Sequence, residues 1–214
     1  MSNWLASVRV ITGAMVAMVL AAAPALACKG AQTVLADNFQ TADSAWGPMF
    51  GANLIISDGQ AQLTVPPGKI GGALYGGILV DSGDYCIDMI APSVADPNTV
   101  LGGIIFGLGD LEDYYAFVAV AGGQAGVLHQ QSSRVTLTVP MNTAPSLQVG
   151  ANATNTIRVT WTGAAVSTYI NGQLFAQLQM PQGFFDSKIG LYVDNATTAP
   201  VTYTFKNLNV TNGP

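Results

Sequence analysis

The strongest constraint on the fold is a period-two alternation of apolar and polar residues, clearest between Ile157 and Phe175. Successive side chains of a β-strand point to opposite faces of the sheet, so this period is typical of half-buried strands and not of helices. The run is interrupted at Thr162-Gly163 and at Asn171-Gly172. Asn-Gly supplies the two positive-φ residues that a type I′ hairpin turn requires. The run therefore predicts a three-stranded antiparallel meander.

The same rhythm continues along the rest of the chain, and no long segment keeps a helical period. Asp58-Gly59 and Gly122-Gly123 are predicted as further hairpin tips. We expect an all-β fold, a two-sheet antiparallel sandwich. The predicted strands are Val34–Phe39, Leu54–Ile56, Ala61–Val65, Ala73–Val80, Tyr85–Ile90, Gly103–Leu108, Tyr114–Ala121, Gly126–Gln130, Val135–Val139, Thr156–Thr162, Val166–Ile170, Gln173–Leu178, Ile189–Val193 and Val201–Val210.

The N-terminus has the pattern of a secretory signal peptide. Arg9 is the only charge before an apolar run from Val10 to Leu26, which ends in Ala25-Leu26-Ala27 with small residues at the two positions that a signal peptidase reads. We expect residues 1–27 to be a signal peptide cleaved after Ala27, and residues 28–214 to form one domain in the periplasm or outside the cell. No later stretch is apolar for long enough to span a membrane.

The charge pattern argues against nucleic acid as a partner. The formal net charge is −5, and the seven lysines and arginines are scattered. Binding to phosphates requires a clustered basic footprint. A surface rich in Thr, Ser, Asn, Gln and Gly suits neutral polar ligands such as carbohydrates.

Two cysteines follow the predicted signal peptide, Cys28 and Cys86. An even number of cysteines in an exported protein favours a disulfide between them. The alternative is lipidation of Cys28, although Ala25 and Leu26 stand in the reverse of the usual lipobox order.

The one dense acidic and aromatic patch is centred on Glu112, the only glutamate of the chain, and Asp113. Tyr114 and Tyr115 follow directly and are candidate ligand-binding residues. Glycosidases of the two-carboxylate kind need an acid and a second carboxylate about 5 to 10 Å apart. The patch is either a catalytic or sugar-binding loop, or a solvated turn at the entrance to a strand.

His129 is the only histidine and is the candidate general base, since its strand follows the acidic patch. The alternative is a hydrogen-bonded histidine without a catalytic role. Gln131, Arg134 and Trp46 complete the candidate ligand-binding residues. A single histidine and no spare thiol pair predict no zinc or iron site. Calcium is the one cofactor left open, through Asp and backbone oxygens, although the sequence has no Asp-x-Asp-x-Asp loop.

The order of several motifs resembles the concanavalin A-like lectin and glucanase jelly roll. These are Leu35-Ala36-Asp37-Asn38-Phe39 with Trp46-Gly47, Asp84-Tyr85-Cys86-Ile87-Asp88, Gly103-Ile104-Ile105-Phe106-Gly107 with Asp113-Tyr114-Tyr115-Ala116-Phe117, and, later, Asn155–Val159, Tyr169-Ile170-Asn171-Gly172, Ile189-Gly190-Leu191-Tyr192 and Phe205–Val210. Within that fold, the chain is most similar to the 3-keto-disaccharide hydrolase (DUF1080) and LamG-like subgroup.

The resemblance implies a jelly roll with one concave sheet, in a family of glycan-binding modules and some glycoside-cleaving enzymes. It also implies the Cys28–Cys86 disulfide. The Glu-x-Asp-x-Glu cluster of the family's glucanases is absent from the sequence, so retaining glucanase chemistry is not expected.

Three functions follow in order of weight. The first is a lectin-like domain that binds a glycan on the concave sheet. The second is a 3-keto-disaccharide hydrolase that uses Glu112 or Asp113 with His129. The third is an envelope structural or adhesion protein.

Overall fold

The structure is a computed structural model that describes residues 28–80, 82–132, 134–180 and 187–213. The predicted signal peptide lies outside the described residues. Strands and their connections make up the described part of the chain, which contains no helix. The all-β prediction is therefore confirmed.

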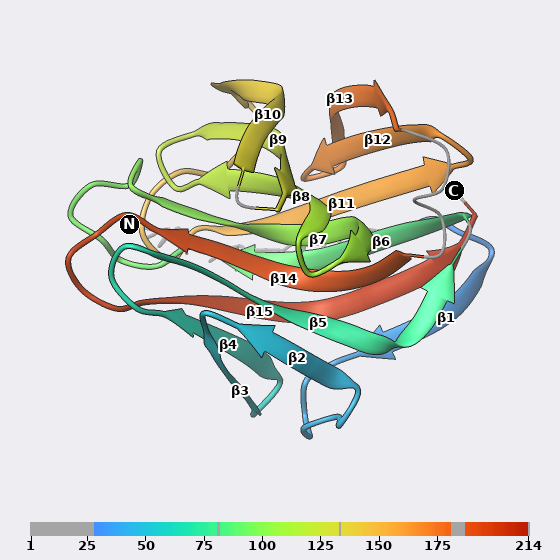
Figure 1. Cartoon of the computed structure of the whole chain (residues 1–214), viewed down its shortest axis with the longest axis horizontal. Coiled ribbons are helices and arrows are strands. Elements are labelled where there is room, and N and C mark those ends of the chain that lie inside the picture. The colour runs from blue at the N-terminus through green and yellow to red at the C-terminus, as the bar shows by residue number, and fades with distance from the viewer. Residues whose placement is uncertain (1–27, 81, 133, 181–186, 214) are drawn as a thin grey trace, which may run out of the picture.

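The strands form two antiparallel sheets that lie over one another (Figure 1). Sheet A has the order β13-β12-β11-β6-β15-β4-β3, and β1 pairs with the C-terminal half of β15. Its strands are β1 (Gln32–Asp37), β3 (Asn53–Ser57), β4 (Gln60–Val65), β6 (Ser82–Ile90), β11 (Thr154–Thr162), β12 (Ala165–Ile170), β13 (Gln173–Gln179) and β15 (Val201–Asn212). Sheet B has the order β10-β9-β8-β7-β14-β5-β2. Its strands are β2 (Trp46–Phe50), β5 (Lys69–Val80), β7 (Val100–Asp110), β8 (Asp113–Val120), β9 (Gln124–Gln131), β10 (Arg134–Thr143) and β14 (Ser187–Asn195).

Each predicted strand overlaps a strand of the structure, and the predicted meander is β11-β12-β13. Asn171 and Gly172 form its second turn with φ of 51° and 81°. The sequence pattern does not predict β2, because Gly47-Pro48 within it is typical of a turn. β2 lies at the edge of sheet B, where a proline without an N–H is tolerated.

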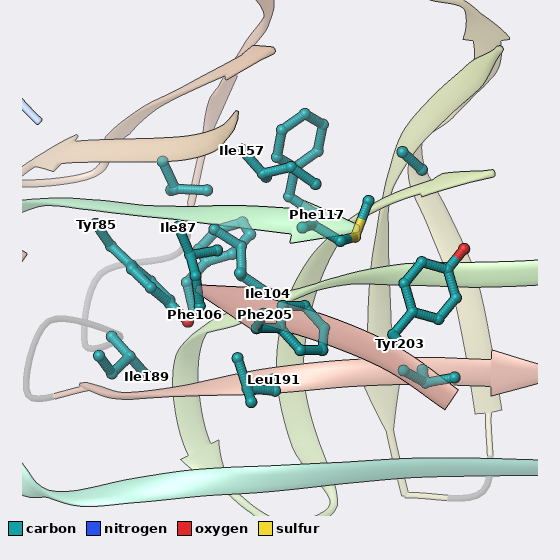
Figure 2. Packing of buried hydrophobic residues seen from close by; sticks show 14 of the residues in the cluster. Tyr85, Ile87, Ile104, Phe106, Phe117, Ile157, Ile189, Leu191, Tyr203 and Phe205 are labelled. Carbon is teal, nitrogen blue, oxygen red and sulfur yellow. The ribbon is translucent and has the colours of Figure 1, made fainter. Parts of the chain in front are cut away.

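The core lies between the two sheets and is built from the inward side chains of both. Figure 2 shows these residues gathered between the strands, with Ile87, Ile157 and Phe205 from sheet A and Ile104 and Leu191 from sheet B. All five are fully buried.

Two buried tyrosines connect the sheets by hydrogen bonds as well as by packing. The Tyr85 hydroxyl on β6 donates to the Gly190 carbonyl on β14 at 3.0 Å, and the Tyr203 hydroxyl on β15 donates to the Val100 carbonyl on β7 at 3.2 Å. A side chain at Gly102 would collide with the Tyr203 ring, since a Cβ there would lie 2.3 Å from it. Glycine at this position therefore allows Tyr203 to reach the other sheet.

The N-terminal residues are anchored to the outer face of sheet A. The predicted disulfide is confirmed and joins Cys28 to Cys86 on β6. Beside it, Arg158 Nε lies 2.7 Å from Asp84 Oδ1 and Arg158 Nη2 lies 2.8 Å from Asp84 Oδ2. The Lys29 amide also donates to Asp84 Oδ2 at 2.7 Å, and the Arg158 guanidinium lies 4.6 Å from the centroid of the Tyr169 ring. Asp84 is fully buried, and every one of these contacts helps to compensate its charge.

We expect the substitution Asp84→Ala to lower the free energy of unfolding by about 3–5 kcal/mol, because it leaves the buried Arg158 guanidinium without its carboxylate. Urea unfolding of the oxidised protein measures this difference. The substitution Asp58→Asn, at an exposed hairpin turn, is the control and should change stability by less than about 0.5 kcal/mol. A loss below about 1 kcal/mol for Asp84→Ala would show that the ion pair does not hold this face.

Candidate functional site

The outer face of sheet B is concave. Phe50 on β2 and Tyr114 on β8 are separated by β5, β14 and β7, a spacing of about 19 Å in a flat sheet. Their ring centroids nevertheless lie 6.0 Å apart. The sheet must therefore curve so that side chains from its two halves converge over the middle strands.

This concave face has an apolar floor that is separate from the core between the sheets. The floor consists of Leu74, Ile105, Tyr114, Ala116, Val118, Leu128 and Tyr192, with Phe50, Ile70, Leu101 and Met141 packed around it. The middle strands of sheet B are thus apolar on both faces.

Three polar groups on this floor lack a protein partner. The Asp194 carboxylate, next to Ile70 and Leu101 in the sheet, is half-buried and accepts no hydrogen bond or ion pair from the described residues. The hydroxyls of Tyr114 and Tyr192 are likewise without a hydrogen bond among those residues. The described polar side-chain atoms that are both fully covered and unbonded are Asn209 Oδ1 and Thr211 Oγ1. The two tyrosine hydroxyls therefore keep contact with solvent, although the residues are only 2% and 1% exposed.

The electrostatics show that these three groups share one environment. Burial, followed by the charge of Asp194, raises the pKa of Tyr114 to about 12. Burial also raises the pKa of Tyr192, with smaller contributions from Asp194 and Tyr114. The pKa of Asp194 is itself raised by burial. Perturbed groups that converge in a concave, mostly apolar surface are the usual mark of a binding site. We call Asp194, Tyr114 and Tyr192 the concave triad.

Asp113 and His129 lie together on the other face of sheet B. His129 Nε2 lies 2.7 Å from Asp113 Oδ1, and the imidazole stacks on the Tyr115 ring with centroids 4.1 Å apart and planes at 2°. Tyr115 belongs to the core between the sheets, so this group lies on the inner side of sheet B, at the end of β8 and β9. The carboxylate orients the imidazole, and the stacked ring holds its plane.

The other predicted residues near the acidic patch surround this pair. Glu112 is exposed in the turn between β7 and β8, and its carbonyl accepts a hydrogen bond from the Ser132 amide. Gln131 ends β9 opposite Asp113 on β8 and opposite Arg134 on β10, and both Gln131 and Arg134 are exposed.

Two predicted ligand-binding residues lie away from the His129 pair. Trp46 is on β2 at the opposite edge of sheet B, where its indole donates to Asp37 at 2.9 Å and packs against Tyr75. Tyr114 points to the concave face and its neighbour Tyr115 to the core, as consecutive residues of a strand must. Of the predicted site residues, the structure places only Tyr114 in the concave triad.

Sequence reasoning did not select Asp194, because the residue directly follows a predicted strand and looks like a turn acid. A usable signal was present in Tyr192 and Asp194, since residues two apart in a strand share a face. Phe50 could not be found in the same way, because its strand contains Gly47-Pro48.

Two searches of the described residues gave no site or span. Within ranges 28–80, 82–132, 134–180 and 187–213, no three His, Cys, Asp or Glu side chains are grouped to hold a metal ion. The same ranges hold no helix with the length and apolar character needed to cross a membrane.

The two curved sheets and their strand order define a jelly-roll sandwich of the concanavalin A-like and galectin-like class, as the sequence resemblance implied. No protein-family model matches the sequence. No curated protein matches it either. The 3-keto-disaccharide hydrolase subgroup stays a prediction.

Solved structures show the same fold at low sequence identity. A carbohydrate-binding module, CBM66 of Bacillus subtilis, has a TM-score of 0.63 at 13% identity and covers 78% of this chain and 96% of its own. A galectin-like protein of unknown function from the same organism has a TM-score of 0.64 at 13% identity, covering 86% and 98%. A β-glucanase of Bacillus licheniformis has a TM-score of 0.60 at 13% identity, covering 85% and 98%.

We expect the substitution Asp194→Asn to stabilise the protein at pH 7 by about 0.5–1 kcal/mol, the usual size of a single stabilising change. The folded-state pKa of Asp194 is raised, so ionisation of this carboxyl destabilises the fold at pH values above that pKa. Below the ordinary value of 3.8 the carboxyl is protonated in both states, and the difference should vanish. Urea unfolding at pH 7 and pH 3 tests this. Equal stability of variant and parent at pH 7 would contradict an uncompensated carboxylate, and Asp58→Asn is the matched control.

Proposed function

We propose that residues 28–214 are an exported carbohydrate-binding domain whose ligand contacts the concave triad. The observation that carries the proposal is the convergence of Asp194, Tyr114 and Tyr192 without protein partners on an apolar concave floor. Export is supported by the signal-peptide pattern of residues 1–27 and by the disulfide, which persists in oxidising compartments.

The chemistry of the triad suits a sugar. An ionised carboxylate only accepts hydrogen bonds, so its ligand must bring donors, and sugar hydroxyls are such donors. Tyrosine hydroxyls both donate and accept, which allows two further polar contacts. The partly buried Phe50 and Met141 beside them offer the apolar contact that the C–H faces of a sugar ring can use.

The fold supports the same conclusion by analogy. One of the solved structures that share it is a carbohydrate-binding module, and another is a glucanase. Such likeness defines the scaffold, while the function must come from the site.

Glycan-array binding of the oxidised protein, followed by calorimetric titration of the best ligand, tests the proposal. Asp194→Asn should weaken binding by about tenfold or more, since a charge-assisted hydrogen bond contributes about 1.5–3 kcal/mol. Tyr192→Phe removes only the hydroxyl and should weaken binding about fivefold, about 1 kcal/mol.

The control is Glu112→Gln, which removes a carboxylate outside the triad and should leave the affinity unchanged. Because Asp194→Asn is expected to stabilise the fold, a loss of binding in this variant cannot result from unfolding. Full affinity in both Asp194→Asn and Tyr192→Phe would refute binding at the triad.

A second candidate function is glycoside cleavage of the 3-keto-disaccharide type, favoured by the contact of 2.7 Å between His129 and Asp113. A carboxylate that orients an imidazole is a common arrangement for a general base. In this reading Glu112, in the adjoining turn, is the nearest further acid in sequence.

Release of monosaccharide from 3-keto-disaccharides measures this activity. If the pair is catalytic, His129→Gln should reduce turnover by a factor of about 10² to 10⁴, the usual contribution of general acid-base catalysis. Glu112→Gln tests the second acid in the same assay. Binding without release in the parent protein would exclude this candidate.

A further inference from the structure

A cavity of about 720 Å³ opens at the end of the sandwich away from the β7–β8 turn. It lies between the β6–β7 connection, residues 91–99, and the β14–β15 connection, residues 196–200. Part of its floor is the start of β15, including Thr202 and Thr204. These threonines alternate with the buried Val201 and Tyr203, so they face outward from sheet A. The cavity and the concave triad are therefore on opposite sides of the molecule.

A buried asparagine holds one wall in place. Asn195 is fully buried, and its amide group donates to the carbonyls of Val65, Pro66 and Ala199 at 3.0, 3.1 and 2.8 Å. Its Oδ1 accepts from the amide and hydroxyl of Thr197 at 2.9 and 2.7 Å. All of its hydrogen-bonding capacity is spent on the connection that forms the wall.

The facing wall is fixed to its neighbours as well. The Ala196 amide donates to the Thr99 carbonyl at 3.0 Å, which joins the two connections directly. Ala91 exchanges backbone hydrogen bonds with residues 152 and 153, at 3.0 Å each. The cavity is thus formed before any ligand arrives, and binding costs little ordering of the protein.

The lining fits an uncharged ligand that carries hydroxyl groups. The hydroxyls of Ser93, Thr198 and Thr204 make no hydrogen bond to the described residues and are available to a ligand. Val94 and Pro200 supply aliphatic surface between them. The lining residues include no lysine, arginine, histidine or aromatic side chain, which disfavours anions and flat aromatic ligands.

We propose that this cavity is a second saccharide site that holds a short, uncharged oligosaccharide. The inference rests on the proposed carbohydrate binding and extends it to a separate place on the molecule. With sites on opposite faces, one domain can bind two chains, or two parts of one chain, and gain avidity.

Backbone amide NMR spectra of the oxidised protein, titrated with cellotriose, laminaritriose and maltotriose, test the proposal. At least one of these sugars should shift amides beside Ser93, Thr198 and Thr204, separately from those beside Asp194. Thr204→Trp fills the floor of the cavity with a bulky ring and should weaken the cavity site tenfold or more while the triad site is unaffected. Asp194→Asn should have the opposite selectivity.

The control Gln173→Trp places the same ring at an exposed position on β13, the far edge of sheet A, and should change neither site. Shifts confined to the triad, or cavity shifts that persist in Thr204→Trp, would overturn the second site and leave the proposed function standing. The absence of shifts at both places with all three sugars would overturn both.

Discussion

The structure depends on how its two sheets are locked face to face. Hydrophobic packing between them is strong but non-directional, so it does not by itself fix how one sheet lies on the other. The hydroxyls of Tyr85 and Tyr203 add direction, because each reaches across the core to one backbone carbonyl of the opposite sheet. The curvature of sheet B and the positions of its connections are set relative to this fixed pair of layers.

The strands could be predicted because an alternating strand records its own exposure in the sequence. Thus β11 and β12 alternate, and their Asn-Gly turn is unambiguous. The middle strands of sheet B carry less information, since β8 is apolar on both faces, and a continuous apolar run does not say which face meets the other sheet. The predicted all-β sandwich and the disulfide were therefore within reach, whereas the second apolar floor was not.

The candidate site shows the same limit more sharply. Local density in the sequence pointed to residues 112–115, yet a β-strand sends Tyr114 and Tyr115 to opposite sides of the sheet. The concave triad combines residues from β8 and β14, which are far apart in the chain and are brought close by a sheet order that no local pattern encodes. Curvature adds Phe50 from the far edge. Sites made by sheet order and curvature need a three-dimensional structure to be found.

The two ends of the described chain leave the sandwich from one corner. Gly30 packs so closely on Thr211 and Gly213 that a Cβ would lie within 2.4 Å of each residue, and the disulfide fixes Cys28 beside them on sheet A. Adjacent ends are what a domain needs to be inserted within another protein's loop, or repeated in tandem, without distortion. As an engineering part, the domain can be grafted through this corner with the concave face of sheet B still pointing outward.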